Sequence, residues 1–456
     1  MLTAIFMVVA LIALATMVMR PKTGALFVWP VLLIYPHGLQ AGWGLPMNIG
    51  LDDLFILFLL GLVMATRVAG RPLRKGPAYK LTLAMFLINL FACAAGLLTA
   101  GTVPGMFSSH LKEVLKQGIL LCYVLCIVES IDTMDECWRM ARWIAYTITA
   151  AGILAMVSTY NATLRNIFVV KGSQIGDAER AFGSLNGPNV VAMVMSYGLC
   201  ISIMLVERAR GLKRLLFLAL PLTMVATTLF TQSRSGFFSM ASIPCILLFM
   251  RGMRKWALGY VMISLLIPVV MPKLLAEIFE RISNIFVGPD NQLSGDAYSR
   301  IRIWIVYLKS MTPVSVMLGQ GHPCSGYRAS FYMWTGGMPP YPHSGYMNLF
   351  CYWGIWGVAW WVALMRSFCR MFRGLKSYGG SDGYLWHKAG WLFLIVCAME
   401  SITKDTFQPG GFGLILTLGF LALTDRFDAC ARERALQAEY SEAELLYPPE
   451  GAAVYA

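Results

Sequence analysis

Five side chains combine residue types that suit a reaction on a phosphate-rich molecule. They are four arginines and one histidine: Arg180, Arg234, Arg300, Arg302 and His343. Arginine binds phosphate through a planar, bidentate fork and keeps its charge. Histidine, with an unperturbed pKa of about 6.5, suits a general base at neutral pH. The set therefore favours a site where a lipid diphosphate is stabilised as a leaving group without a divalent cation.

The elements that must position these residues are membrane helices. Of the 456 residues, 57% are hydrophobic and only 13% are charged, whereas soluble domains carry about 25% charged residues. The apolar residues fall in runs of roughly 17–21, which cross about 30 Å of hydrocarbon as helices. We therefore predict an all-α, polytopic transmembrane bundle of roughly 12–13 helices. It would carry one large outer loop that contains short helices.

About thirteen apolar segments can be drawn. They begin near Leu2, Gly24, Leu51, Leu81, Val114, Ala141, Pro188, Arg214, Gly236, Trp256, Gly345, Trp386 and Gly411. The second, Gly24–His37, is short and contains two prolines, so a tilted or re-entrant element is the alternative. The first, Leu2–Met19, lacks a basic region before it and a clear cleavage site. We interpret it as a retained helix.

The basic residues predict the orientation of these helices. The chain has a net charge of +13, and basic residues cluster in four alternate gaps between apolar segments, at 67–80, 208–214, 251–255 and 366–376. Cytoplasmic loops carry such an excess, so these gaps are predicted to be cytoplasmic. The C-terminal tail from Asp425 then lies on the same side, as a frayed end. The basic residues are not interleaved with aromatic ones, and no nucleic acid is expected as a partner.

Four regions follow from this topology. They are N-terminal transmembrane helices over 1–271, a large outer loop over 272–344, C-terminal transmembrane helices over 345–428, and a cytoplasmic tail over 429–456. Within the loop, Lys273–Val287 has apolar residues at helical spacing. This pattern predicts an amphipathic helix, either on the membrane surface or packed on the bundle.

Cysteines and metal ligands give no sign of a cofactor. Most of the eleven cysteines lie in or beside apolar segments, where they behave as small hydrophobes. Only Cys324 lies in the large outer loop, where we expect it to be exposed and without a disulfide partner. No spacing of Cys and His resembles a zinc site. Neither a metal nor another cofactor is expected.

The predicted topology places the four arginines and His343 on the outer side. Short outward loops normally avoid arginine, so Arg180 and Arg234 are exceptions that indicate function. The structural alternative for Arg180 is a snorkelling side chain or an ion pair with Asp177 or Glu179. For His343, which follows Pro342 at the start of a predicted helix, the alternative is a capping or core histidine.

The segment from His343 to Gly357 resembles a known motif. It reads His, Ser, nine residues, then Gly354-x-x-Gly357. This is similar to the motif of the O-antigen ligase and polymerase superfamily, in which Asn, Ser or Gln follows the histidine. Three upstream blocks are similar to family segments: Arg180 to Asn189, Thr231 to Gly236, and Arg300-x-x-x-Trp304 followed by Gly319-Gln-Gly321. Leu51-Asp-Asp-Leu54 resembles the acidic start of an early helix.

This resemblance implies a bacterial inner-membrane glycosyltransferase with its site facing the periplasm. Such an enzyme takes a glycan from undecaprenyl diphosphate, inverts its anomeric configuration and needs no metal. Arg180, Arg234 and Arg300 would hold the diphosphate, and His343 would deprotonate or orient the acceptor hydroxyl. Further substrate-binding candidates lie in the same motifs: Arg302, Asn189, Ser233, Ser344 and Gly321. Gly187, between Asn186 and Pro188, departs from the usual Asn-Pro-Asn block, and His322 has no assigned role.

The acceptor stays open at this point. A ligase passes the glycan to lipid A-core or another terminal acceptor, whereas a polymerase passes it to a second undecaprenyl-linked repeat unit. The His motif is closer to the ligase form. A ligase that modifies protein is a further alternative, and other polysaccharide-assembly proteins are expected partners besides the membrane lipid. A flippase for the lipid-linked glycan would favour charged residues near the midplane and paired repeats, which the sequence lacks.

Overall fold

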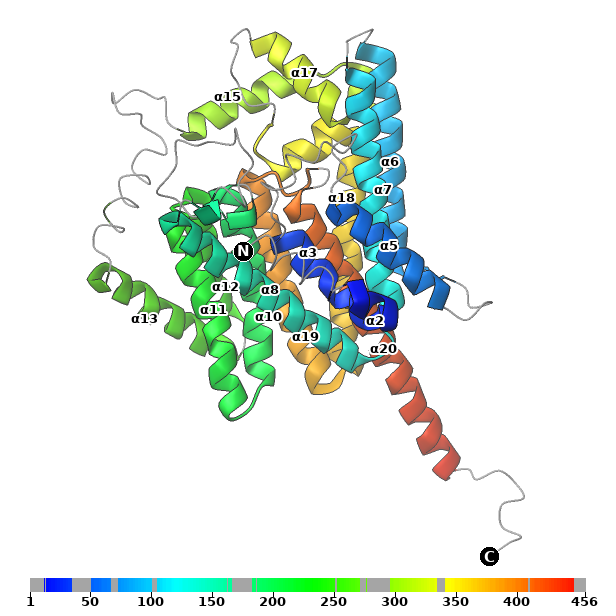
Figure 1. Ribbon diagram of the computed structural model, residues 1–456, viewed down its shortest axis with the longest axis vertical. Coiled ribbons are helices and arrows are strands. Elements are labelled where there is room, and N and C mark those ends of the chain that lie inside the picture. Colours follow the sequence, from blue (N-terminus) through cyan, green and yellow to red (C-terminus); the bar gives the residue numbers. More distant parts are fainter. Residues whose placement is uncertain are drawn as a thin grey trace, which may run out of the picture.

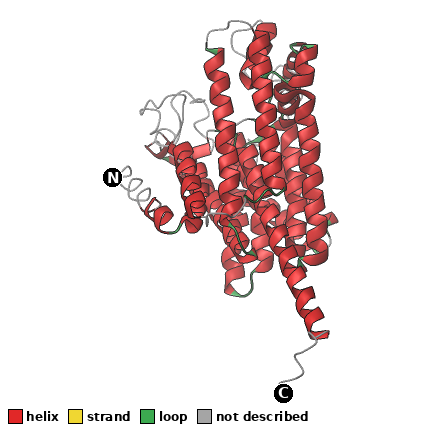
Figure 2. Cartoon of the chain, turned by 90° about the vertical axis from the view of Figure 1, so that its right-hand side faces the viewer, coloured by secondary structure: helices red, strands yellow, loops and turns green. Residues whose placement is uncertain are grey.

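The computed structural model is helical over the residues that it describes. These are residues 12, 14–34, 51–66, 73–100, 105–161, 163–165, 183–185, 187–250, 252–270, 276, 296–333, 341–408 and 411–446. Within these ranges no residue is in a strand, and the long helices pack side by side (Figure 1, Figure 2). The predicted all-α class is confirmed.

The first part of the chain forms most of the bundle. Its elements are α2 (Pro21–Gly24), η1 (Ala25–Phe27), α3 (Val28–Ile34), α5 (Leu51–Thr66), α6 (Pro77–Ala100), α7 (Met106–Ser130), α8 (Met134–Tyr160), η3 (Gly183–Leu185), α10 (Pro188–Arg208), α11 (Leu212–Phe230), α12 (Arg234–Phe249) and α13 (Arg254–Val270). Short links join most of these helices, so successive links lie at alternate ends of the bundle.

The second part adds three shorter helices and three long ones. They are α15 (Asp296–Lys309), α16 (Pro313–Leu318), α17 (Gly321–Met333), α18 (Gly345–Tyr378), α19 (Gly380–Thr403) and α20 (Phe412–Leu446). In the described part of the chain, six helices are long and apolar enough to cross a membrane, namely α6, α8, α10, α11, α18 and α19. This agrees with a polytopic membrane protein.

The short helices gather at one end of the bundle, which we call the His343 end. In Figure 1, α15 and α17 cross the top of the molecule, where α6 and α7 reach their upper limits. Side chains of α17 reach α6: the Cys324 thiol points at the carbonyl of Gly96 at 3.6 Å, and Arg328 donates to the carbonyl of Thr99 at 2.8 Å. The predicted outer loop therefore rests on the helices of the first part.

Helix α10 forms the centre of the bundle. All of its residues from Val191 to Val206 are buried, and it packs against α8, α11, α12 and α19. A helix that is apolar on every side suits this position, because no face of it has to meet water. Its first turn therefore stands at a fixed place at the His343 end.

Charged side chains join the helices at the opposite end. Asp382 at the start of α19 accepts hydrogen bonds from Trp138 and Arg208, each at 3.0 Å. The Arg208 guanidinium also lies 4.4 Å from the centre of the Trp138 ring. These contacts hold α8, α10 and α19 together at this end of the bundle.

A kink in α18 receives the turn between α16 and α17. Gly354 interrupts the helix with a φ of 63° and ψ of −152°, and Gly319 has a φ of 75°. A Cβ atom on Gly354 would lie 2.6 Å from the nitrogen of Gly319, and one on Gly319 would lie 2.6 Å from the Cα of Trp353. Only glycine combines this backbone conformation with so close an approach. The two family motifs that contain these glycines therefore meet in space.

The structure differs from several sequence predictions. Helix α7 begins at Met106, well before the start near Val114 that the apolar pattern predicts. Its first turns contain the polar residues His110, Lys112 and Glu113, which a search for apolar segments leaves out. Cys324 is buried rather than exposed, since α17 packs on α6.

The C-terminal segment also differs from its prediction. Helix α20 continues through the expected frayed tail to Leu446, and Asp425, Arg426 and Asp428 are buried. Arg426 donates to the carbonyl of Ile131 at 3.0 Å, which explains why these charged residues pack against the bundle. The predicted amphipathic helix Lys273–Val287 lies almost wholly outside the described residues.

We predict that Gly319→Ala weakens the attachment of the outer helices. A side chain at this position would have to adopt a backbone conformation that costs about 1–3 kcal/mol for residues other than glycine, and its Cβ would clash with the backbone of α18. Gly211→Ala is the matched control, because Gly211 has a φ of 57° but nothing within 4 Å of an added Cβ. The melting temperature in detergent should fall clearly more for Gly319→Ala. Equal losses in the two variants would contradict the proposed packing role.

Candidate active site

His343 stands at the His343 end in a hydrogen-bonded pair with an aspartate. Its Nδ1 lies 3.1 Å from an Oδ2 oxygen of Asp405, in the loop between α19 and α20. The other carboxylate oxygen of Asp405 accepts a hydrogen bond from the amide of Asn348 at 3.2 Å. Asn348 is buried on the first turn of α18. The histidine ring is thus oriented by a carboxylate that is itself held from α18.

The side chain of His343 is more exposed to solvent than that of its partner Asp405. It is 38% exposed, whereas the Asp405 side chain is 19% exposed. When Nδ1 donates to the carboxylate, Nε2 carries the lone pair that can accept a proton. This arrangement is typical of a general base whose tautomer is fixed by an acidic neighbour.

Two turns at this end share one backbone pattern. His343 has a φ of 51° and precedes Ser344, which caps α18; Gln232 has a φ of 49° and precedes Ser233, which caps α12. Each serine accepts a hydrogen bond from a backbone N–H in the first helical turn. Left-handed conformations are uncommon for residues other than glycine and cluster at functional sites. The pattern links the two predicted motifs that contain His343 and Arg234.

Helix α15 holds the loops that carry His343 and Asp405. Arg300 donates to the carbonyl of Thr403 at 2.6 Å, and the indole of Trp304 donates to the carbonyl of Pro342 at 2.7 Å. The two residues are four apart, so they project from the same face of the helix. The Arg-x-x-x-Trp motif therefore fixes the backbone on both sides of the His343–Asp405 pair.

A buried ion pair lies beside Asp405. The ammonium of Lys404 is 2.5 Å from a carboxylate oxygen of Glu400, and both side chains are almost fully buried. Burial lowers the pKa of Lys404, while the neighbouring Glu400 acts in the opposite direction. Breaking such a pair would leave an uncompensated buried charge, so it fixes the start of the loop.

The first turns of α10 and α12 lie side by side. Ser233 donates to the side-chain oxygen of Asn189 at 2.8 Å, which joins the start of α12 to the start of α10. Helix N-termini carry partial positive charge and unpaired N–H groups, so neighbouring N-termini favour an anion. The substrate-binding candidates Asn189 and Ser233 are thereby brought into contact.

The loop that follows Asp405 connects these turns to α18. An added Cβ on Gly345 would meet Phe407 at 3.0 Å, and one on Gly413 would meet the Thr406 Cα at 2.7 Å and the Met193 sulfur of α10 at 3.1 Å. The starts of α10, α12 and α18 therefore share one neighbourhood with His343.

The other predicted site residues have different positions. Arg180 lies outside the described residues, and Arg234 opens α12 with its side chain outside the described part. Arg302 is exposed on α15, unlike the half-buried Arg300. Ser344 donates to the carbonyl of Ser401 at 3.2 Å, and buried Gly321 would place an added Cβ 3.0 Å from the Cys93 sulfur. Ser344 and Gly321 thus have packing roles that the sequence did not reveal.

Sequence reasoning missed Asp405, Lys404 and Asn348. A usable signal was present for Lys404, because it is a basic residue in a short loop predicted to face outward, which is the same exception that singled out Arg180 and Arg234. Asn348 gave no such signal, since it reads as an ordinary polar residue near a helix start. In the ranges that the structure covers, no group of three or more His, Cys, Asp or Glu could hold a metal ion.

Comparison with known families agrees with this geometry. Residues 219–362 match the family model described as O-antigen ligase. The matched range contains Arg234, Arg300, His343 and the kink glycine Gly354, while Arg180 precedes it. A search among curated proteins gives no match. The family match confirms the resemblance to the O-antigen ligase and polymerase superfamily, whose members are membrane glycosyltransferases.

We expect Asp405→Asn to lower kcat by about 10²–10⁴-fold, in line with the loss of the aspartate from other His–Asp pairs. The variant keeps the size of the side chain but removes the charge that favours the productive tautomer of His343. Asp135→Asn is the control, because the Asp135 side chain is 88% exposed on α8 at the opposite end. Glycan transfer by the purified variants, with melting temperatures measured in parallel, tests this. Unchanged transfer by Asp405→Asn would exclude an orienting role.

Proposed function

We propose that the protein is an O-antigen ligase-like glycosyltransferase of the bacterial inner membrane. It moves a glycan from undecaprenyl diphosphate to an acceptor hydroxyl on the periplasmic face, and its C-terminus is cytoplasmic. The observation that carries the proposal is the accessible His343, held by Asp405 between loops that Arg300 and Trp304 fix. A purely structural bundle would not need an oriented, accessible histidine at the end where these motifs meet.

In the proposed reaction His343 acts as the general base. Its Nε2 takes the proton of the acceptor hydroxyl while the oxygen forms a bond to the anomeric carbon of the donor glycan. The bond from that carbon to the diphosphate oxygen breaks, and the diphosphate leaves with the electron pair. Attack from the face opposite the leaving group inverts the anomeric configuration. Asp405 stabilises the imidazolium that forms.

The diphosphate is proposed to be held by Arg180, Arg234 and Arg300, without a metal. Arg234 opens α12 beside the start of α10. The positive N-terminal ends of both helices therefore add to the positive charge of the arginine in attracting an anion. Developing charge on a leaving group is stabilised best by donors that are fixed before the reaction. The hydrogen bond from Arg300 to the carbonyl of Thr403 fixes the guanidinium of Arg300 in this way.

A polymerase that extends undecaprenyl-linked repeat units is the second candidate. It shares the donor, the leaving group and the base, and the family match supports either member type equally. The two differ only in the acceptor. We name the ligase type first because the His motif is closer to that form.

We expect Arg180→Ala and Arg234→Ala each to reduce glycan transfer by at least about 10²-fold, the scale seen when one fixed donor to a developing charge is removed. Arg→Lys at either position should also fail, because lysine lacks the bidentate fork. Arg210→Ala, exposed at the opposite end, is the control for a lost positive charge. Membrane insertion should be normal in all variants. Full transfer by both alanine variants would refute the diphosphate site.

The accumulating intermediate in a strain that lacks the protein should identify the acceptor. We expect long glycan on the undecaprenyl carrier and none on the final acceptor, as measured by gel electrophoresis of surface polysaccharide beside analysis of the lipid-linked pool. Single repeat units on the carrier would instead identify a polymerase. Units trapped on the inner leaflet would contradict both and indicate a flippase.

A further inference from the structure

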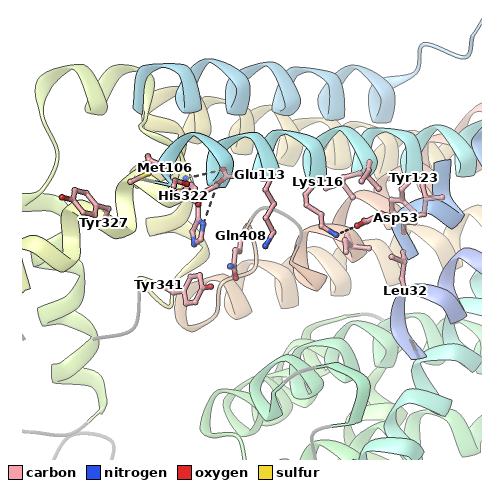
Figure 3. A pocket seen from close by; sticks show the side chains of 18 residues that line it. Leu32, Asp53, Met106, Glu113, Lys116, Tyr123, His322, Tyr327, Tyr341 and Gln408 are labelled. Atoms are coloured by element: carbon pink, nitrogen blue, oxygen red, sulfur yellow. Dashed lines mark hydrogen bonds and ion pairs between the residues drawn. The ribbon is translucent and has the colours of Figure 1, made fainter. Parts of the chain in front are cut away.

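A cavity beside the candidate active site contains basic residues that the proposed reaction does not use. It has a volume of about 690 Å³ and lies among α3, α5, α7, α17 and α20. Figure 3 shows its labelled side chains spread along α7, with Tyr327, Met106 and His322 toward one end and Asp53, Tyr123 and Leu32 toward the other. Tyr341 and Gln408 lie below α7 in this view. Cavities of this size commonly bind small ligands or the head groups of larger ones.

One end of the cavity borders the His343–Asp405 pair. Its wall there includes Tyr341, two residues before His343, and Gln408, three residues after Asp405. The Tyr341 ring stacks on His322 with ring centres 5.2 Å apart and planes at 11°. Tyrosine, glutamine and histidine side chains can bind sugar hydroxyls, so this end suits a glycan that approaches His343.

The middle of the cavity is cationic. Lys112 and Lys116 both line it and are four residues apart on α7, so they face the same side about 6 Å apart along the helix axis. Lys116 pairs with the buried carboxylate of Asp53 (Figure 3). No described carboxylate lies within ion-pair distance of Lys112. An ionisable residue inside a membrane bundle is costly and indicates a ligand.

The state of the neighbouring His322 leaves Lys112 as the main cation at this level. Burial lowers the pKa of His322 to about 4, so the ring is neutral at neutral pH. The ring Nδ1 lies 3.7 Å from Glu113, whose carboxylate also accepts from the His322 backbone N–H at 3.4 Å. Glu113 thus contacts His322 and forms no ion pair with Lys112, which faces the cavity.

The far end of the cavity is mainly apolar. Beyond the Lys116–Asp53 pair its wall includes Tyr123 and five aliphatic residues from α3, α5, α7 and α20, namely Leu32, Ile56, Ile119, Leu120 and Ile415. The cavity therefore changes from sugar-binding groups, through a cationic zone, to hydrocarbon. Lys112 lies six residues, or about 9 Å along the axis, from the first residue of α7, so it is near the His343 end of that helix.

We propose that Lys112, supported by the Lys116–Asp53 pair, binds the phosphate of the acceptor lipid. The ligand is a phosphate-bearing amphiphile whose glycan reaches His343 and whose hydrocarbon lies against the apolar end. Arg300 is the one proposed donor arginine whose side chain is described; it contacts the carbonyl of Thr403 and does not line this cavity. We therefore assign the donor and acceptor phosphates to separate sites around His343. This inference rests on the proposed function, because it assigns the second substrate of the same reaction.

Native mass spectrometry of the full-length protein tests the assignment with three probes: undecaprenyl diphosphate, diphosphoryl lipid A and uncharged undecaprenol. The wild type should bind two phosphate-bearing lipids. Two molecules of undecaprenyl diphosphate indicate a lipid-linked repeat unit as the acceptor, and one molecule of each lipid indicates lipid A. Lys112→Gln should weaken one of the two by about tenfold, the scale of one charge-assisted hydrogen bond.

Control variants distinguish loss of the positive charge at Lys112 from a change in side-chain shape and from misfolding. Lys112→Arg should restore the second lipid, and Lys309→Gln, exposed on α15, should change nothing. Undecaprenol binding should be unaffected by Lys112→Gln. The double variant Lys116→Gln with Asp53→Asn removes a cation without leaving a buried carboxylate unpaired, and it should also weaken the second lipid.

Three results would overturn the proposal. Lys112→Gln could retain both phosphate-bearing lipids, it could lose the same molecule that Arg234→Ala loses, or it could lose undecaprenol to the same extent. Failure of the proposed function is distinguishable, because it concerns transfer rather than lipid binding. His343→Ala should abolish transfer while both lipids remain bound.

Discussion

The contact between Gly319 and Gly354 is the constraint on which the candidate site depends. It allows the α16–α17 turn to lie against the kink in α18 at backbone distance. From there α15 reaches the carbonyls of Thr403 and Pro342 through Arg300 and Trp304. That attachment helps to fix the left-handed backbone at His343. Glycines of two motifs therefore act on the candidate site through geometry and not through chemistry.

Electrostatics explains why the site residues come from segments far apart in the sequence. Several polar groups at this end are paired with a group from another segment of the chain: His343 with Asp405, Asp405 with Asn348, Ser233 with Asn189. An unpaired polar group in a membrane bundle would cost several kcal/mol. The pairs therefore stabilise these segments, while the His343 side chain stays accessible among the described residues.

The sequence was sufficient for the fold class and for the motifs, but not for their contacts. Hydrophobic runs predict α10 and α19 because a membrane helix needs a fixed apolar length. The positions of Arg300 and Trp304 are recognisable, yet their partners Thr403 and Pro342 offer only backbone carbonyls, which carry no signature. Cys324 was predicted to be exposed because a polar loop gives no sign that α17 packs on α6. Asp405 needed the three-dimensional pairing with His343 to be noticed.

The start of α7 shows why a hydropathy pattern can misplace the end of a helix that carries polar residues. A rule that ends a helix at polar residues excludes His110, Lys112 and Glu113, and so predicts a loop where the structure has helix. Those residues are polar because they face a cavity or buried partners instead of lipid, and the helix is kept by its packing against α6, α5 and α20. The proposed transfer between two lipids would require both head groups to reach one base. Polar turns inside otherwise apolar helices are the places where such head groups can enter the bundle, since a wholly apolar helix offers them no partner.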